Sequence, residues 1–277
     1  MYEAYTEPAG QVGSFLSLAS NGLRVLRSLG VLEQVQRVGI DVPGQRMWSS
    51  SGKLLGEVPR GRMSSDDLHS VTLMRGALVE VLRAEALAAG AVIVTSERLV
   101  DVLAIEEGVR AVFASGLMAE ASLLIGADGM WSATWSLLDP DAPIPEYAGL
   151  HRLDAVPVCH NDCIALLGDA GHPVGAGHGA SMALEDALVL AQSLAEEPSA
   201  AAALSAYETA RSARMAKMTK AASDNRDAKT AGPLTRRMRD LVMPLAVRLF
   251  YEKATAWLYT HDCGQLPTSQ PDGESQV

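Results

Sequence analysis

The chain has 277 residues, of which 48% are hydrophobic and 20% charged. This composition is typical of globular proteins and excludes disorder, collagen and coiled coil for most of the length. The 23 Lys and Arg against 33 Asp and Glu give a net charge of −10, which argues against nucleic acid as the main partner. Three cysteines cannot form a disulfide framework, so we expect a reducing, cytoplasmic location. No apolar run of about 18 residues predicts a membrane span, and no signal peptide is seen.

The first 90 residues predict two helices separated by short strands. Leucines recur at helical spacing over 20–38, with an interruption at Gly30. Segments punctuated by Ser and Gly predict strands and turns over 42–71. The clearest amphipathic helix covers 75–89, because Gly90 then stands where a helix C-terminus belongs.

The middle of the chain predicts a strand at 91–95 and then a small β-meander. Its strands are expected at 99–105, 109–114 and 119–125. Residues 139–163 carry Pro and Asp without a sustained period, which indicates a loop or linker.

The last part predicts a short buried strand at 164–167, a glycine-rich loop and a long helix over 180–196. Residues 201–261 are expected to form helices broken near Gly232-Pro233 and Met243-Pro244. The polar tail, 267–277, is predicted to be disordered.

The glycine-rich stretch, residues 168–181, carries the strongest functional signal. A buried strand ends in Gly168-Asp169, and a helix then opens at a glycine. Free N–H groups at a helix start suit an anionic or electron-rich ligand, and glycines allow the ligand to approach the backbone. A carboxylate at the strand end can accept a hydrogen bond from a sugar hydroxyl. Taken alone, the pattern fits a purely structural loop equally well.

This stretch, with Ala183-Leu184-Glu185-Asp186-Ala187 after it, resembles the Gly-Asp motif of FAD-dependent aromatic-ring hydroxylases. These are single-component flavoprotein monooxygenases of the p-hydroxybenzoate hydroxylase type. The resemblance implies that the Gly168-Asp169 carboxylate bonds the ribityl chain of FAD and that Gly177 and Gly179 lie against the flavin. The loop before Gly177 is shorter here than is usual in that family.

Two further motifs agree with that resemblance. Residues 125–132 resemble the family's second fingerprint, which implies that Asp128 and Gly129 lie near the FAD pyrophosphate. Residues 73–78 resemble the family's Arg-x-x-Leu helix start, which implies that Arg75 contacts FAD. The alternative for Arg75 is an ordinary arginine on a helix surface. Trp135 stands where the family usually has Arg.

The resemblance implies an α/β fold: an FAD/NAD(P)-binding, Rossmann-like parallel sheet with a small β-meander and C-terminal helices. We expect an incomplete FAD-binding domain over 1–197 and a helical region over 198–266. Residues 42–72 would be a remnant of the substrate-domain strands, and 139–163 would replace the family's substrate sheet, for which they are too short.

The family's opening strand–Gly-x-Gly-x-x-Gly–helix unit is not found in this sequence. We therefore expect the first βα unit to be missing, through a truncation or a misassigned start. Glu3 would then end the second strand and accept from the adenosine ribose. The alternative is that Glu3 is an exposed terminal glutamate. An exposed sheet edge would call for a rearranged packing, a homo-oligomer or another partner that covers it.

The function implied by the resemblance is hydroxylation or epoxidation of an aromatic or polyketide-like small molecule. FAD would be the cofactor, with NAD(P)H as co-substrate and O2 as oxidant. No side chain is identified as catalytic. The alternative is a non-catalytic remnant, or a flavin-free binding protein of the same fold.

Other polar clusters in the sequence receive structural interpretations. His172 and His178 flank the loop, but flavin chemistry comes mainly from the cofactor. Cys159, His160 and Cys163 offer too few ligands for zinc, so no metal site is predicted.

Two further patterns are also interpreted structurally. Trp131 and Trp135 are expected to be packing residues. Four cations at helical spacing predict a solvated helix face: Arg211, Arg214, Lys217 and Lys220.

Overall fold

The structure is a computed structural model of the whole chain. It describes residues 1–7, 14–49, 51–139, 141, 146–147, 151–152, 159–172, 178–230 and 233–267. The expected flavin-contact residue Gly177 and nearly all of the predicted disordered tail lie outside this described part.

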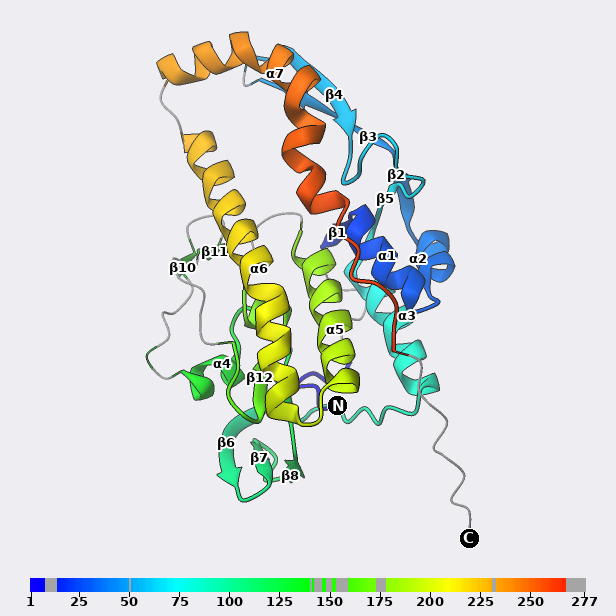
Figure 1. Cartoon of the computed structure of the whole chain (residues 1–277), viewed down its shortest axis with the longest axis vertical. Helices are drawn as coiled ribbons and strands as arrows, with labels where there is room; N and C mark the ends of the chain where they lie inside the picture. The colour runs from blue at the N-terminus through cyan, green and yellow to red at the C-terminus, as the bar shows by residue number, and fades with distance from the viewer. Residues whose placement is uncertain are drawn as a thin grey trace.

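Helices and short strands alternate through the first half of the chain (Figure 1). In order they are β1 (Phe15–Leu18), α1 (Ser20–Ser28), α2 (Leu32–Val38), β2 (Ile40–Val42), β3 (Gly44–Trp48), β4 (Leu54–Pro59), β5 (Ser70–Met74), α3 (Arg75–Ala88), β6 (Leu99–Ile105), β7 (Gly108–Phe113), β8 (Met118–Ala121) and β9 (Leu124–Gly126).

The second half is mostly helical. Its elements are α4 (Ala133–Leu138), β10 (Glu146–Tyr147), β11 (His151–Arg152), β12 (Ile164–Leu166), a 3-10 turn η1 (Gly168–Ala170), α5 (Gly179–Glu196), α6 (Ala200–Thr230) and α7 (Pro233–Tyr259). Two-residue strands β10 and β11 pair within the segment predicted to be a loop or linker.

The sheets are small and mainly antiparallel. One has the strand order β1-β5-β2, another is the β3–β4 hairpin, and a third is the predicted meander β6-β7-β8. Strand β9, predicted as the end of that meander, instead pairs in parallel with β12. The mixed α/β class is confirmed, but the described residues contain no continuous Rossmann-like parallel sheet.

The expected strand at 91–95 explains part of this difference. Its residue Val94 forms only an isolated parallel bridge with Tyr2, flanked by backbone hydrogen bonds from Glu3 to Val94 and from Glu97 to Glu3. Strands β9 and β12 have three residues each. The described parallel pairings are therefore too short and too separate to form one wide sheet.

The predicted helices form where leucines can be buried on one face. Helix α1 buries Leu23, Val25 and Leu26, and helix α2 follows after a break at Gly30. Helix α3 ends as the sequence predicts, because Gly90 adopts φ +88° and its N–H bonds the carbonyl of Leu87. The backbone at Gly90 favours glycine, since other residues pay a steric cost there.

The largest hydrophobic cluster of the described part lies between β1, β5 and the first three helices. It consists of Leu18, Leu23, Leu26, Val31, Val35, Leu68, Val71, Leu73 and Leu78. Helix α5 packs between α1 and α6, and the C-terminal end of α7 returns toward α1 (Figure 1). Helix α5 therefore connects the N-terminal elements α1 and β1 with α6 and the Gly168 turn.

Two local predictions are wrong. Trp131 is 64% exposed, not packed, whereas Trp135 is buried. Helix α7 continues through Pro244, although Figure 1 shows its direction changing along its length. Proline can remain inside a helix at the cost of a kink, because it removes one hydrogen bond. No helix in the described part of the chain is both long enough and apolar enough to cross a membrane.

Candidate functional site

Two predicted motifs meet at one edge of the parallel pair β9–β12. Leu166 pairs with Gly126, so Gly168 and Asp128 each follow a paired position by two residues. Because the carboxyl ends of parallel strands lie at the same edge, the Asp128-Gly129 and Gly168-Asp169 turns are neighbours. Ligands of open α/β sheets bind at this kind of edge.

The Gly168 turn needs its glycine. Gly168 has φ +57°, and an added Cβ would lie 2.9 Å from the Cβ of Ala183 on α5. Its N–H donates to Oδ2 of Asp186 at 3.1 Å, which ties the turn to α5. Asp169 is exposed in the following 3-10 turn. The turn thus holds its backbone against α5 and leaves the Asp169 carboxylate on the surface.

The carboxylate of Asp128 is hydrogen-bonded to the segment that follows it, although the residue is exposed. It accepts hydrogen bonds from the hydroxyl of Ser132, from the N–H of Thr134 at 3.0 Å and from Oγ1 of Thr134 at 3.1 Å. These contacts cap the start of α4. Gly129 differs: it has φ +78°, and the space where a Cβ would stand is open. The backbone at Gly129 therefore has room for a ligand, and the exposed carboxylate of Asp128 already accepts three hydrogen bonds.

Arg75 is the first residue of α3 and is exposed. Its N–H donates to the carbonyl of Ser14 at 3.3 Å, which places it beside the start of β1. Its guanidinium forms no ion pair with a carboxylate of the described residues. The positive end of the helix dipole repels a cation at the helix N-terminus. An anion bound there would be attracted by both the guanidinium and the dipole.

Glu3 lies beside the segment 92–97, not beside the glycine motifs. Its Oε1 accepts from the N–H of Tyr5 at 3.0 Å, which closes a local turn. The described residues therefore bring together Asp128, Gly129, Gly168 and Asp169. Glu3 contacts the segment 92–97 instead.

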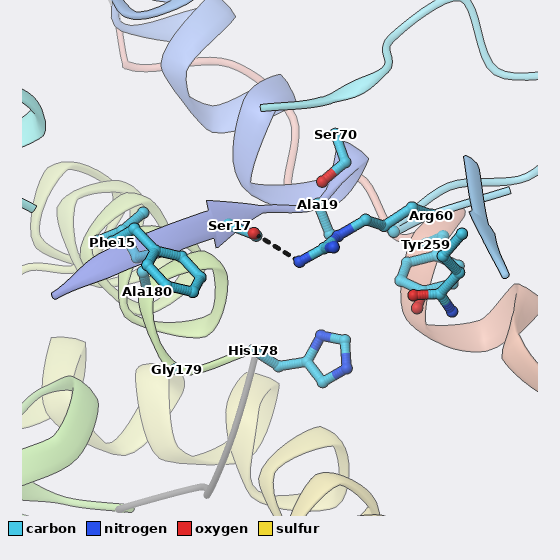
Figure 2. Close-up of a pocket in the computed structure, with 12 residues that line it drawn as sticks. Phe15, Ser17, Ala19, Arg60, Ser70, His178, Gly179, Ala180 and Tyr259 are labelled. Atoms are coloured by element: carbon cyan, nitrogen blue, oxygen red, sulfur yellow. Dashed lines mark hydrogen bonds between the residues drawn. The ribbon is translucent and has the colours of Figure 1, made fainter. Parts of the chain in front are cut away.

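A cavity of about 440 Å³ opens where α5 begins. Figure 2 shows Arg60 reaching into it, with its Nη2 donating to Oγ of Ser17 at 2.9 Å. The residues that line it are Phe15, Leu16, Ser17, Ala19, Gln45, Arg60, Gly61, Ser70, His178, Gly179, Ala180 and Tyr259. The predicted flavin-contact residue Gly179 is therefore a wall of this cavity.

His178 lies at the entrance to α5, and its ring is 6.2 Å from the ring of Tyr259, centroid to centroid. Its Nδ1 is buried and has no hydrogen-bond partner in the described part of the chain. Burial lowers the pKa of His178, because the charged form loses its hydration. A neutral imidazole with an unused nitrogen thus faces the region where a ligand would sit.

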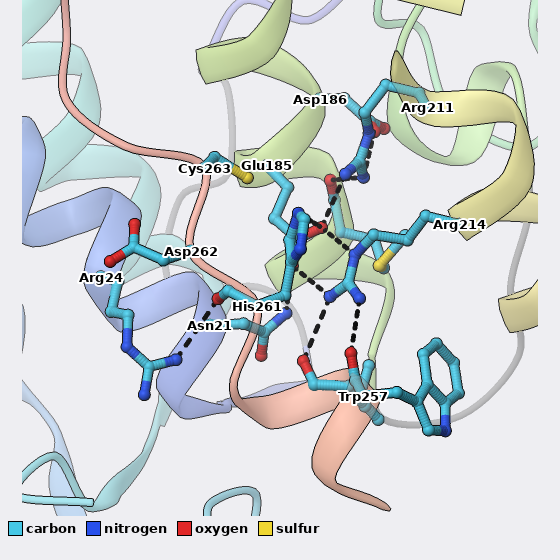
Figure 3. A network of polar contacts seen from close by, with 12 residues as sticks. Asn21, Arg24, Glu185, Asp186, Arg211, Arg214, Trp257, His261, Asp262 and Cys263 are labelled. Carbon is cyan, nitrogen blue, oxygen red and sulfur yellow. Dashed lines mark hydrogen bonds and ion pairs between the residues drawn. The ribbon is translucent and has the colours of Figure 1, made fainter. Parts of the chain in front are cut away.

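The basic stripe predicted on α6 is solvated only in part: Lys217 and Lys220 are exposed, but Arg211 and Arg214 pack against α5. Arg211 is 1% exposed; its Nε donates to Oδ1 of Asp186 and its Nη1 to Oε2 of Glu185, both at 2.8 Å. Arg214 also binds Glu185 and donates to the carbonyls of Trp257 and Leu258 (Figure 3). We call Glu185, Asp186, Arg211 and Arg214 the buried charge network. Helix spacing identified one face of α6 but not the acids that pack on it.

The network keeps its two acids ionised. Burial acts to raise the pKa of Asp186, but the hydrogen bond to His172 and the charge of Arg211 outweigh it, so the pKa is lowered. The pKa of Glu185 is lowered in the same way: burial opposes ionisation, and Arg214 and Arg211 overcome it. His172 is thus a partner of Asp186 inside the fold.

One group of possible metal ligands lies next to this network. Glu185, His261 and Cys263 have ligand atoms within 4.8 Å of one another. Glu185 is already neutralised by two guanidinium groups, and burial raises the pKa of the Cys263 thiol to about 12. A divalent cation would have to displace the arginines and deprotonate the thiol, so this geometry disfavours a metal.

Sequence reasoning missed Arg60, Ser17 and Tyr259 as cavity residues. Their elements are far apart in the chain, and no sequence pattern links them to one another. The adjacent acids Glu185 and Asp186 did carry a signal. Two acids within an otherwise apolar stretch of helix need buried partners if that face is packed.

Comparison with known proteins gives a consistent pattern, although no protein-family model matches the chain. It is 32% identical over 152 residues to 3-amino-4-hydroxybenzoate 2-monooxygenase of Streptomyces cremeus. This match covers 51% of this chain and 36% of that protein. It is 29% identical over 146 residues to aurachin C monooxygenase/isomerase of Stigmatella aurantiaca, covering 50% of this chain and 36% of that protein. The matched region thus spans about a third of the length of these curated relatives.

Solved structures share the fold at lower identity. Klebsiella pneumoniae HpxO, complexed with FAD and uric acid, superposes with a TM-score of 0.71 at 19% identity, covering 90% of this chain and 88% of that one. The tetrameric form of 2-methyl-3-hydroxypyridine-5-carboxylic acid oxygenase gives a TM-score of 0.66 at 19% identity, covering 83% and 84%.

Proposed function

The chain belongs to the family of FAD-dependent aromatic monooxygenases and matches part of the length of its relatives, and from this premise we propose that it binds FAD. FAD would lie along the carboxyl edge of β9 and β12 and reach the start of α5. The bound flavin would serve the hydroxylation of an aromatic small molecule, with NAD(P)H and O2 as co-substrates. Residues 1–197 would form the FAD-binding part and 198–266 a helical support.

The observation that carries this proposal is the alignment of the two turns with the helix start. Gly129 leaves open space at a backbone with positive φ, and Asp169 presents an exposed carboxylate at the neighbouring turn. Gly179 then lines a cavity at the N-terminus of α5. A dinucleotide needs room at the backbone, a hydroxyl acceptor and a helix start, and these features fit those needs.

Each residue then has a distinct task. Asp169 would accept from a hydroxyl of the ribityl chain, and the backbone at Gly129 would lie against the pyrophosphate. Arg75 would supply a positive charge to that diphosphate from the start of α3. Asp128 would act indirectly, because its bonds to α4 hold the Gly129 turn in place.

When bound, FAD would supply the oxygen-activating chemistry, which no protein side chain provides. The protein would orient the substrate and exclude water from it. The relatives support an aromatic substrate: one is named for 3-amino-4-hydroxybenzoate, another for 3-hydroxybenzoate, and HpxO was solved with uric acid.

A direct test is titration of the purified chain with FAD, followed by flavin fluorescence. We expect saturable binding. Asp169→Asn should weaken it about 10-fold or more, because a hydrogen bond to a charged group is lost. Asp162→Asn is the matched control, since Asp162 is exposed in the turn before β12, and its affinity for FAD should equal that of the wild type. A wild-type chain that takes up no FAD would refute the proposal.

A second candidate is a flavin-free binding protein of the same fold. It is favoured by the hydrogen bonds that engage the Asp128 carboxylate with the start of α4. NADPH-dependent oxygen consumption separates the two candidates. Turnover of an aromatic substrate above a free-flavin control removes the second, and ligand binding without FAD uptake removes the first.

A further inference from the structure

The outer face of helix α7 carries large apolar side chains that the fold leaves exposed. Leu241, Leu245 and Leu249 recur every four residues and therefore form one stripe along the helix. Val242 and Phe250 adjoin this stripe, and all five residues are between 57% and 77% exposed. We call these five residues the α7 apolar surface. Contiguous exposed apolar surface of this kind marks a site of contact with a protein or a membrane.

The opposite face of α7 is already used by the fold. Val247 and Leu258 are buried there, and a Cβ added to Gly56 of β4 would lie 2.7 Å from Cγ1 of Val247. Figure 1 shows α7 along one end of the molecule, beside the β3–β4 hairpin. The helix is thus apolar on both its inner and its outer side, whereas a surface helix usually has a polar outer face.

Helix α7 is also a basic element in an acidic protein. Its side chains include five cations and two acids, which are Arg236, Arg237, Arg239, Arg248 and Lys253 against Asp240 and Glu252. The net charge of this helix is therefore +3, whereas the whole chain carries −10. The chain outside α7 is correspondingly more acidic than the total.

Two of these cations lie beside the α7 apolar surface. Arg248 follows Leu245 by three residues and Lys253 follows Leu249 by four, and these are the spacings at which helix side chains are neighbours. Both cations are exposed, and neither forms an ion pair with a described carboxylate. Their charges are therefore available to an anionic surface.

Apolar and cationic groups on one helix favour a lipid surface over a second copy of the chain. A helix with exposed leucines and neighbouring cations is the kind that lies in the interface of an anionic membrane. Pairing of α7 with the same helix of a second copy would bring two basic helices together, which like-charge repulsion opposes. An anionic surface would repel the acidic remainder of the chain and attract α7, so the electrostatic field would orient the protein.

We propose that α7 docks this protein on an anionic lipid bilayer. The α7 apolar surface would enter the boundary between headgroups and acyl chains, and Arg248 and Lys253 would contact lipid phosphates. The helix would lie in the plane of the bilayer surface and not cross it. This function is additional to the proposed binding of FAD and does not depend on it.

The test is co-sedimentation of the full chain with lipid vesicles. Vesicles of equal parts phosphatidylcholine and phosphatidylglycerol should bind the wild type about 10-fold more tightly than vesicles of phosphatidylcholine alone, because each cation near an anionic surface adds to the affinity. High salt should reduce this preference, since it screens exposed charges.

Two variants separate the apolar from the electrostatic part. Leu245→Glu should weaken binding to the anionic vesicles about 10-fold or more, because the burial of one leucine is lost and a like charge is introduced. Arg248→Glu should weaken binding to the anionic vesicles about 10-fold and leave binding to the neutral vesicles within about twofold.

Matched controls place the same substitutions on other helices. Leu87→Glu changes a leucine that is 49% exposed on α3, and Arg37→Glu changes an exposed arginine on α2. Neither should alter vesicle binding. Circular dichroism checks that each variant is folded. If Leu245→Glu fails to fold, the wild-type comparison of anionic with neutral vesicles still decides.

Several outcomes would overturn the inference: equal binding to the two kinds of vesicle, no binding to either, or equal losses in the α7 variants and their controls. A second copy as the occupant would also overturn it. Light scattering without lipid would then show a wild-type dimer that Leu245→Glu converts to a monomer.

Discussion

Arg211 and Arg60 are two arginines in contrasting surroundings. Arg211 is buried between α5 and α6 and binds the carboxylates of both Glu185 and Asp186. Arg60 lines a cavity, and a serine hydroxyl is the hydrogen-bond partner that the structure gives its guanidinium. The first charge is neutralised by the fold and the second is not. The contrast separates an arginine that maintains the structure from one that is available to a ligand.

The contrast extends to neighbouring acids. Asp186 is fully buried, and its carboxylate contacts the N–H of Gly168, the ring of His172 and the guanidinium of Arg211. Asp169, one residue after Gly168, is exposed at the edge of β9 and β12. The Gly168 turn therefore donates a backbone hydrogen bond to the buried acid Asp186 and carries the exposed acid Asp169. Burial distinguishes the two roles better than residue type does.

The largest expected effect comes from Arg211→Met, which keeps the approximate volume but leaves Asp186 buried without its cationic partner. We expect the free energy of unfolding to fall by about 3–5 kcal/mol, the cost of breaking a buried pair. Urea denaturation followed by circular dichroism measures this change. The control is Arg110→Met, which removes an exposed pair with Glu120 and should cost less than about 1 kcal/mol. Equal losses in the two variants would show that the network is not a structural requirement.

The elements around this network were largely predictable, because their signals are local. The predicted helix over 180–196 corresponds to Gly179–Glu196, and the predicted strand over 164–167 corresponds to Ile164–Leu166. Leucine periodicity and glycines at helix ends are signals that lie within the helix itself or directly beside it. Such signals locate an element but do not specify what packs against it.

The failures follow from long-range packing. Arg211 and Arg214 of α6 were assigned to solvent, because their spacing identifies only a face of the helix and the acids that bind them lie on α5. The expected parallel sheet came from the family resemblance, and its strand at 91–95 formed a single bridge with Tyr2 instead. Arg60 carried no signal at all, since its cavity is assembled from elements that extend from Phe15 to Tyr259. Contacts between distant segments were outside the reach of local patterns.

A second prediction concerns pH. The pKa values of Glu185 and Asp186 are lowered in the fold, so both bind protons less readily there than in the unfolded chain. Their contribution to stability is therefore complete above their ordinary pKa values, about 4.3 and 3.9, and is lost as pH falls below them. Each unit of difference corresponds to about 1.4 kcal/mol.

Denaturation midpoints measured from pH 7 to pH 3 test this expectation. The wild type should lose stability most steeply below about pH 4.5, and Glu185→Gln should flatten that acid limb. Neutral His178 acts in a different window: its pKa is lowered, so its contribution is lost as pH falls below about 6.5. His178→Asn should flatten only this upper limb, and an unchanged profile in both variants would contradict the assignment.

The smallest expected effect is that of Arg60→Met on the stability of the ligand-free protein. Arg60 is partly buried, has a neutral partner and leaves its charge unpaired, so its loss should change the free energy of unfolding by no more than about 0.5 kcal/mol. Ser17 would keep its hydrogen bond with Thr72. Urea denaturation followed by circular dichroism compares the two proteins. A loss of several kcal/mol without ligand would instead place Arg60 with Arg211 as a structural charge.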